Sequence, residues 1–205
     1  MALQRRLASE VAEERLPENI KLVAGVDCSY SEKDKKILSG AVVFDSGSWK
    51  QITSATSVGD CSFPYVSGLL SFREAPAVIE VIEKLDFQPD LLLCDGQGRA
   101  HPRRLGLASH VGLWLQIPTI GVAKSCLCGD YRMPGKRKSC NTRLIHKGEV
   151  VGRVVRTRSG VKPVFVSPGH LVNLADSVRW TLRSARRYRL PEPSRAAHRL
   201  VSDIK

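Results

Sequence analysis

The chain has 205 residues, of which 42% are hydrophobic and 25% are charged. These are ordinary fractions for a globular protein, and they exclude a disordered, collagenous or disulfide-stapled chain. At roughly 150 residues per domain, we expect a single domain over residues 1–205. The 32 Lys and Arg residues against 20 Asp and Glu give a formal net charge of +12. A surplus of this size favours an acidic partner, either nucleic acid or an anionic membrane surface.

The start of the chain resembles neither a membrane segment nor a secretory signal. No run approaches the roughly 18 apolar residues that cross a bilayer. Leu3, Leu7 and Val11 recur at helical spacing, which predicts an amphipathic helix over residues 1–17 that ends at Pro17. The six cysteines form no C-x-x-C pair. We therefore expect reduced thiols, no membrane association and a cytoplasmic location.

Strands dominate the first third of the chain. Segments rich in β-branched and apolar residues lie at 21–30, 37–45 and 50–58. Because the gaps between them are short, these segments favour an antiparallel meander. Residues 75–85 then place apolar side chains at helical spacing, which predicts a helix.

The rest of the chain alternates between predicted strands and helices. In chain order they are a strand at 91–95, a helix at 102–115, a strand at 119–123, a hairpin of 148–157 with 162–167, and a last helix at 171–190. Asn173 is the expected N-cap of that last helix. The short apolar runs are typical of buried parallel strands. The predicted fold is α/β, with a mixed antiparallel and parallel sheet flanked by helices on both faces.

Two carboxylates follow apolar strand segments. Asp27 comes after LVAGV and Asp95 after LLLC, and Glu74 precedes the first predicted internal helix. If the two strands are parallel neighbours, their carboxyl ends lie at one sheet edge, where α/β folds bind ligands. Carboxylate oxygens suit Mg²⁺ or Mn²⁺, as a metal-dependent phosphodiesterase requires.

Each acid also has an alternative structural interpretation. An aspartate at a strand end is often only a turn residue. Ser71 and Glu74 fit a helix capping box, although Pro76 would then fall past the first turn of the helix. Both interpretations stay open at the level of residue pattern.

Aromatic and basic residues fall near the same predicted edge. Tyr65 lies in a loop bounded by proline and glycine, and such an aromatic can wedge between bases or instead cover the core. His101 follows the glycine loop after Asp95, and Lys124 ends the strand TIGVA. A lysine there could neutralise charge that develops on a phosphate, or it could be an ordinary solvated group.

Basic residues are also dense late in the chain. Residues 132–158 hold nine Lys or Arg residues and one acid, Glu149. The predicted last helix carries a stripe of arginines at Arg179, Arg183 and Arg186/Arg187. These groups could track a phosphate backbone or form a solvated face.

Six longer motifs, from roughly residue 22 to residue 193, give the chain a specific resemblance. They are GVDCSY, FPYVSGLLSFRE, LLLCDGQGRAHPRRLGLASHVG, IPTIGVAKS, PVFVSPGH and YRLPEP, in that order. The sequence resembles the endonuclease V family of inosine-directed nucleases. The resemblance implies a ribonuclease H-like fold, which agrees with the mixed sheet predicted above.

The resemblance also implies roles for individual residues. Asp27, Glu74 and Asp95 match the metal-binding acids of the family, which require Mg²⁺, with Mn²⁺ as a substitute. Lys124 in GVAK and His170 in the glycine–histidine motif match active-site positions.

Substrate contacts are implied in the same way. Tyr65 matches the tyrosine that helps to wedge the strands apart, and Arg73 and His101 match positions close to the bound strand. The base would enter a pocket lined by glycine-rich loops, which include Gly96 and Gly121. The implied reaction is hydrolysis of the second phosphodiester bond 3′ to deoxyinosine, leaving 3′-hydroxyl and 5′-phosphate ends.

Two other functions stay open. Some relatives cut inosine-containing RNA, and the motifs do not separate RNA from DNA. A non-catalytic nucleic-acid-binding domain would share the fold, but it has no need of three metal-binding acids. The expected partner is therefore DNA that contains deoxyinosine, or inosine-containing RNA, and the protein is expected to be a monomer.

Overall fold

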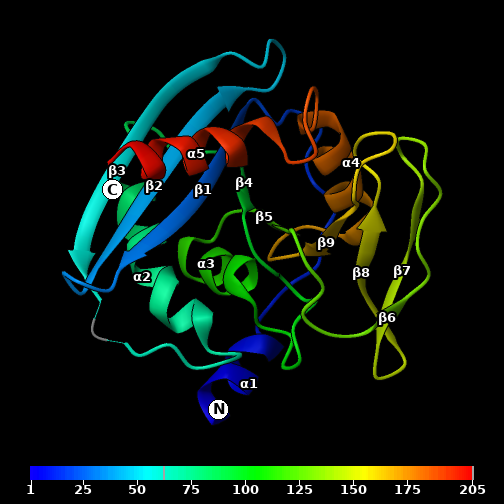
Figure 1. The fold of residues 1–205 in the computed structure, drawn as a ribbon, viewed down its shortest axis with the longest axis horizontal. Helices are drawn as coiled ribbons and strands as arrows, with labels where there is room; N and C mark the ends of the chain where they lie inside the picture. The colour runs from blue at the N-terminus through cyan, green and yellow to red at the C-terminus, as the bar shows by residue number, and fades with distance from the viewer. Residues whose placement is uncertain (62, 205) are drawn as a thin grey trace.

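A computed structural model describes residues 1–61 and 63–204. In these residues the strands form one nine-stranded sheet in the order β3-β2-β1-β4-β5-β9-β8-β7-β6 (Figure 1). In chain order the elements are α1 (Ala2–Ser9), β1 (Leu22–Ser31), β2 (Lys36–Asp45), β3 (Gln51–Asp60), α2 (Leu70–Glu83), β4 (Leu91–Cys94), α3 (Leu107–Leu115), β5 (Thr119–Ala123), β6 (Asp130–Tyr131), β7 (Asn141–His146), β8 (Glu149–Val155), β9 (Val164–Pro168), α4 (Leu174–Ser184) and α5 (Glu192–Asp203).

The sheet is mixed, as predicted. Strands β1, β2 and β3 form an antiparallel meander, whereas β1, β4 and β5 are parallel neighbours. Val26 pairs with Cys94, and Cys94 pairs with Gly121, so β4 ends level with the middle of β1, which continues to Ser31, and near the end of β5. Strands β9, β8, β7 and β6 extend the sheet in antiparallel pairs beyond β5.

Helices cover both faces of the sheet. Ala24, Leu92 and Cys94 face α2 and α3, where Val78 and Val111 complete one buried cluster. Neighbouring residues on the same strands face the other way, toward Trp180 of α4, and α5 packs over β1 and β2 (Figure 1). Burial on both faces explains why β4 is a continuous apolar run rather than an alternating one.

The N-terminal helix is shorter than predicted, because α1 ends at Ser9 rather than at Pro17. The segment that follows makes tertiary hydrogen bonds in place of helical ones. The Ala12 carbonyl accepts from the Leu171 N–H, and the Leu16 N–H donates to Asp176. The predicted apolar stripe is also wrong in part, since Leu3 is 49% exposed.

The internal helices also begin at other residues than predicted. Helix α2 starts at Leu70 and contains Pro76, so Ser71 lies inside the helix and the capping-box interpretation is wrong. Helix α3 starts at Leu107 rather than at residue 102. Arg104 has a left-handed φ of 61°, which an α-helix excludes.

The C-terminal region holds two helices instead of one. Asn173 caps α4 as predicted, its side chain accepting from the Asp176 N–H at 2.8 Å. The helix then ends at Ser184, not at residue 190. The sequence interpretation missed α5 as well as strands β6 and β7. In β7 only Leu144 is buried, so no clear alternation marks that strand.

The six cysteines are free thiols, as expected. None of the helices in the described ranges combines the length and the apolar character that a bilayer crossing requires.

Candidate active site

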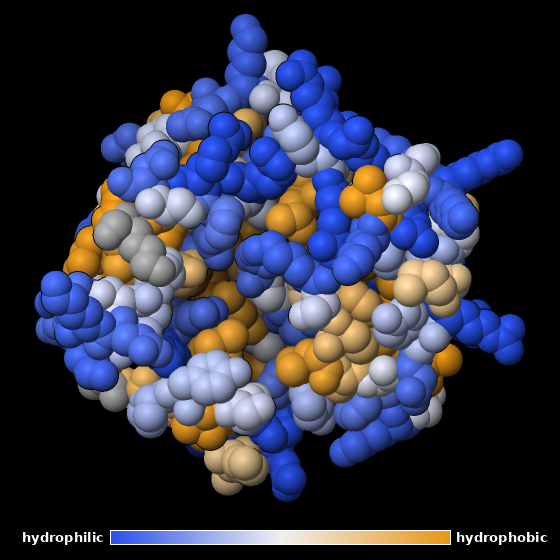
Figure 2. All heavy atoms as spheres, viewed as in Figure 1, coloured by the Kyte–Doolittle hydropathy of each residue, from blue (hydrophilic) through white to orange (hydrophobic). Residues whose placement is uncertain are grey.

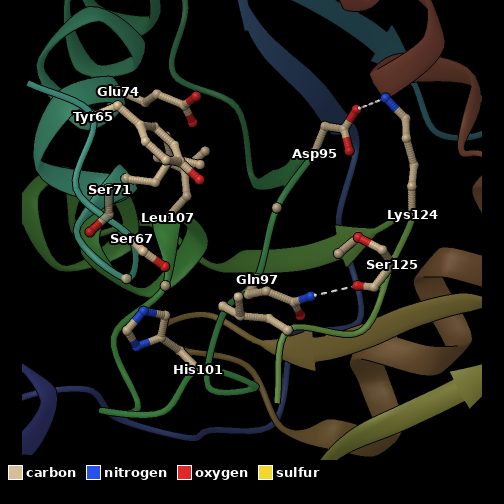
Figure 3. A pocket seen from close by; sticks show the side chains of 16 residues that line it. Tyr65, Ser67, Ser71, Glu74, Asp95, Gln97, His101, Leu107, Lys124 and Ser125 are labelled. Atoms are coloured by element: carbon tan, nitrogen blue, oxygen red, sulfur yellow. Dashed lines mark hydrogen bonds and ion pairs between the residues drawn. The ribbon is translucent and has the colours of Figure 1, made fainter.

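The parallel pairing of β1 and β4 brings two of the predicted acids together at the carboxyl end of β4, although Asp27 itself lies within β1, which continues to Ser31. Asp27 follows Val26 and Asp95 follows Cys94, and those two preceding residues are paired across the parallel strands. The parallel arrangement expected from the apolar runs therefore places both carboxylates level at one sheet edge. Glu74 approaches this edge from α2, on the opposite side of a cavity from Asp95 (Figure 3).

These acids lie close enough to affect one another. Burial, with the nearby charges of Asp27 and Asp95, raises the pKa of Glu74 to about 7. Burial also raises the pKa of Asp27; the Asp95 charge adds to that rise, whereas a hydrogen bond with His198 opposes it. The edge thus concentrates negative charge that water only partly solvates, and a bound cation would relieve that repulsion.

Two basic side chains contact the acids. Lys124 directly follows β5, and its ammonium group forms an ion pair with Asp95, which is the edge predicted for it. His198 on α5 places Nδ1 2.6 Å from a carboxylate oxygen of Asp27. The sequence interpretation did not include His198. It lies beyond the last matching motif and 171 residues from its partner, so no local pattern links the two residues.

His170 lies elsewhere, which contradicts the placement expected for it. The carbonyl of His170 accepts from the N–H of Thr119, at the start of β5, whereas Lys124 follows the other end of that strand. Its Nδ1 accepts from the N–H of Ala12 at 3.2 Å. A glycine–histidine motif cannot reveal which end of a neighbouring strand it will pair with. In this protein His170 anchors the N-terminal segment.

A cavity of about 310 Å³ adjoins the acidic edge. This volume is at the lower end of the roughly 300–1,000 Å³ typical of small-molecule sites. The acids lie at one end of the cavity and His101 at the other (Figure 3). On the face of the molecule drawn in Figure 2, most surface residues are hydrophilic, and apolar residues are visible in its recesses. The cavity is lined by Tyr65, Ser67, Gly68, Leu70, Ser71, Glu74, Asp95, Gly96, Gln97, His101, Gly106, Leu107, Ala123, Lys124, Ser125 and Leu127.

Three residues that were predicted to contact the substrate line this cavity, and a fourth supports one of its loops. Tyr65 is 69% exposed on its rim, and Gly96 lines it. His101 is buried, and the cost of burying its charge, with nearby Arg103, lowers its pKa to about 4. It is therefore neutral at pH 7, with Nδ1 accepting from the Arg103 N–H. Gly121 does not line the cavity. A Cβ there would lie 2.4 Å from the Gly98 nitrogen, so glycine is required for the loop after β4 to pack on β5.

Arg73 was also predicted to contact the substrate, but its side chain points away from the cavity. Its guanidinium stacks 3.7 Å over the ring of Tyr30, outside the cavity lining. Its charge still lowers the pKa of Glu74, although burial and the neighbouring acids outweigh that effect. Arg73 therefore adjoins the acidic edge without facing the cavity.

Some of the late basic residues serve the fold. The buried guanidinium of Arg156 donates to the carbonyls of Pro134, Gly135 and Val161. Arg183 stacks on Trp180 and donates to the Ser46 carbonyl at 3.1 Å. The predicted stripe of arginines on one helix is thus interrupted, because α4 ends before Arg186.

The chemistry of the donor set fits a hard divalent cation, since it offers carboxylate oxygens and partial burial. In residues 1–61 and 63–204, no three His, Cys, Asp or Glu side chains form a ready-made ligand cluster. The ion pairs described above account for part of this, because Lys124 and His198 each engage an acid.

Comparison with known proteins assigns the family. The family model for Endonuclease V matches residues 5–199. The Endonuclease V of Gloeobacter violaceus is 49% identical over 201 residues, which cover 96% of this chain and 81% of that protein. The crystal structure of Endonuclease V from Streptomyces avermitilis has a TM-score of 0.95 at 43% identity, covering 99% of this chain and 90% of that chain. The Ciona intestinalis Endonuclease V, in complex with DNA containing an inosine followed by a ribo-adenosine, has a TM-score of 0.86 at 27% identity, covering 99% of this chain and 95% of that one. This chain belongs to the Endonuclease V family of nucleases, which act on phosphodiester bonds.

Proposed function

We propose that this protein is a metal-dependent repair endonuclease that recognises deoxyinosine, the product of adenine deamination, in DNA. It hydrolyses the second phosphodiester bond on the 3′ side of the lesion and leaves 3′-hydroxyl and 5′-phosphate ends. The observation that carries the proposal is the junction of an acidic edge and a cavity of about 310 Å³, which share Glu74, Asp95 and Lys124. One feature suits phosphate chemistry and the other suits a single base.

The cavity fits a nucleobase that has left the helix stack. An enzyme that inspects a base in a duplex must extrude it, which costs a few kcal/mol of unstacking. Tyr65, on the rim, is placed to stack against the neighbouring base and offset that cost. The neutral ring of His101 closes the far end of the cavity without adding charge.

Asp27, Glu74 and Asp95 would hold Mg²⁺ or Mn²⁺ at the acidic edge. A divalent cation bound there supplies Lewis-acid polarisation of the phosphate and lowers the pKa of an attacking water. The chain itself contributes Lys124, whose ammonium group can move from Asp95 to the phosphate and neutralise its developing charge. His198 holds the Asp27 carboxylate in one orientation.

Inosine-containing RNA is a second candidate substrate. The observation that favours it is that the Ciona intestinalis protein binds a strand in which a ribose follows inosine. A site can distinguish RNA from DNA only by contacting or excluding the 2′-hydroxyl. We propose that the protein acts as a monomer.

The test compares matched oligonucleotides that contain inosine or adenine, as DNA and as RNA, with Mg²⁺ or with EDTA. We expect Mg²⁺-dependent cutting of inosine DNA at the second phosphodiester bond on the 3′ side of the inosine. The Asp27→Asn and Asp95→Asn variants should lose this activity, whereas Asp34→Asn, an exposed matched control, should keep it. Equal cutting with EDTA, or by the Asp27→Asn and Asp95→Asn variants, would falsify the assignment. Faster cutting of RNA would favour the second candidate.

A further inference from the structure

Gln4 is an unusual residue in α1. Its side chain is 1% exposed, although glutamine is mostly an exposed residue. The amide Nε2 donates to the carbonyl of Gly68 at 3.0 Å and to the carbonyl of Leu105 at 3.1 Å. The amide oxygen accepts from Nε of Arg103. The buried amide is therefore bonded through both its nitrogen and its oxygen, to segments 64 and 101 residues away.

The two carbonyls that Gln4 contacts belong to two separate segments at the wall of the cavity. Gly68 ends the loop that carries Tyr65, and Leu105 directly precedes Gly106; both Gly68 and Gly106 line the cavity. Gln4 itself does not line it. The amide therefore joins two segments of the cavity wall without lining the cavity itself.

The Gly68 contact also fixes a special backbone conformation. Gly68 has a left-handed φ of 76°, and its carbonyl accepts a second hydrogen bond, from Nη2 of Arg103 at 2.6 Å. A Cβ at this position would lie 2.6 Å from that same nitrogen. Two donors thus hold the one carbonyl at the end of the Tyr65 loop.

We propose that Gln4 is a positioning residue that sets the width of the base cavity and the place of the Tyr65 loop. This proposal rests on the proposed function, which assigns the cavity to an extruded base. Only a side-chain amide can donate to two carbonyls and accept from a guanidinium at once. A carboxylate of the same shape keeps the bond with Arg103 but places oxygen against the oxygens of Gly68 and Leu105.

The position of Gln4 separates its effect from the cleavage chemistry. Gln4 contacts none of Asp27, Asp95 and Lys124 through a hydrogen bond, and its partners lie at the wall of the cavity. Loosening the walls should weaken the fit of the base, which changes KM and selectivity. The rate at saturation should change little, because the acidic edge stays intact.

The experiment compares Gln4→Glu with Gln88→Glu, the same chemical change at an exposed glutamine whose amide donates to Leu115. The unchanged protein must first cut inosine DNA; if it does not, the proposed function fails and the role of Gln4 as a base-positioning residue fails with it. For Gln4→Glu we expect KM to rise about tenfold, because the buried hydrogen bonds to the carbonyls of Gly68 and Leu105 are lost. We expect kcat to stay within about threefold of the value for the unchanged protein. The preference for inosine over adenine should fall by a similar factor. Gln88→Glu should match the unchanged protein.

Circular dichroism and the melting temperature establish that each variant is folded under the assay conditions. If Gln4→Glu does not fold, Arg103→Met removes the second donor to Gly68 and should show the same rise in KM. An unchanged KM and an unchanged selectivity in the folded variant would overturn the proposal. So would a loss confined to kcat, which would place the effect at the acidic edge.

Discussion

Nδ1 of His198 lies 2.6 Å from a carboxylate oxygen of Asp27, and the two residues are 171 positions apart in the chain. Helix α5, which carries His198, packs across β1 and β2 (Figure 1). The last helix of the chain therefore completes a site that the first strand begins. Carboxylates that bind metals are commonly oriented by a hydrogen-bond partner of this kind.

Replacing His198 with alanine should lower cleavage of inosine DNA about 10- to 100-fold, because Asp27 loses the group that orients it. The measurement is the single-turnover rate at saturating Mg²⁺. Asp203→Asn, an exposed change on the same helix, is the control and should retain the full rate. A rate for His198→Ala equal to that of the control would show that the contact has no part in the reaction.

Lys124 should act through its charge. We expect Lys124→Met to lose roughly a hundredfold to a thousandfold in kcat, since a fixed cation near the phosphate is removed. Lys124→Arg keeps a cation and should retain part of the activity. The control is Lys136→Met, at an exposed lysine in the late basic segment. Equal loss in the Met and Arg variants would argue against a role for charge.

His101 should make stability depend on pH. A histidine in an unfolded chain titrates near pH 6.5, and the folded protein lowers the pKa of His101 to about 4. Between these values the unfolded chain binds more protons, so the free energy of unfolding should fall as pH falls, by up to about 3 kcal/mol.

Denaturant unfolding of the unchanged protein and of His101→Gln, at pH 7 and pH 4.5, isolates this contribution. The variant is needed because Glu74, with its pKa raised to about 7, affects stability with the opposite sign. Its burial penalty is present above that pH and is relieved as the pH falls. Parallel pH profiles for the two proteins would contradict the role assigned to His101.

His170 should affect stability and not cleavage. His170→Ala leaves the N–H of Ala12 without its acceptor, which should cost about 1 to 3 kcal/mol of unfolding free energy. His170→Asn offers an oxygen near the position of Nδ1 and should recover part of that loss. Both variants should cut inosine DNA at the rate of the unchanged protein. A large loss of cleavage rate in folded His170→Asn would show that His170 takes part in the reaction after all.

The most buried parts of the fold were the most predictable from sequence. Residues 119–123 form β5 as predicted, and β4 differs by a single residue. Both strands are fully buried, because both of their faces are covered. The same runs located Asp95, which follows the end of β4, and Asp27, which lies level with it inside β1 because the two strands are parallel neighbours.

The errors lie where tertiary contacts replace local ones. Residues 10–17 are not helical as predicted, because the carbonyl of Ala12 and the N–H of Leu16 form hydrogen bonds with residues in and near α4 instead. Strand β7 went undetected because it buries only Leu144 and so lacks a period of two. Gln4 was hidden because a polar residue on an amphipathic helix is expected to face water.

The sequence by itself determined the positive charge, the three acids, the apolar runs that precede two of them, and the family resemblance. These depend on residue type and local period, which a linear pattern records. Only the tertiary structure decided which histidine meets an acid, which basic groups are bonded into the fold, and which residue joins the walls of the cavity. Those choices depend on tertiary contacts between residues up to 171 positions apart, and such contacts leave no periodic signal in the chain.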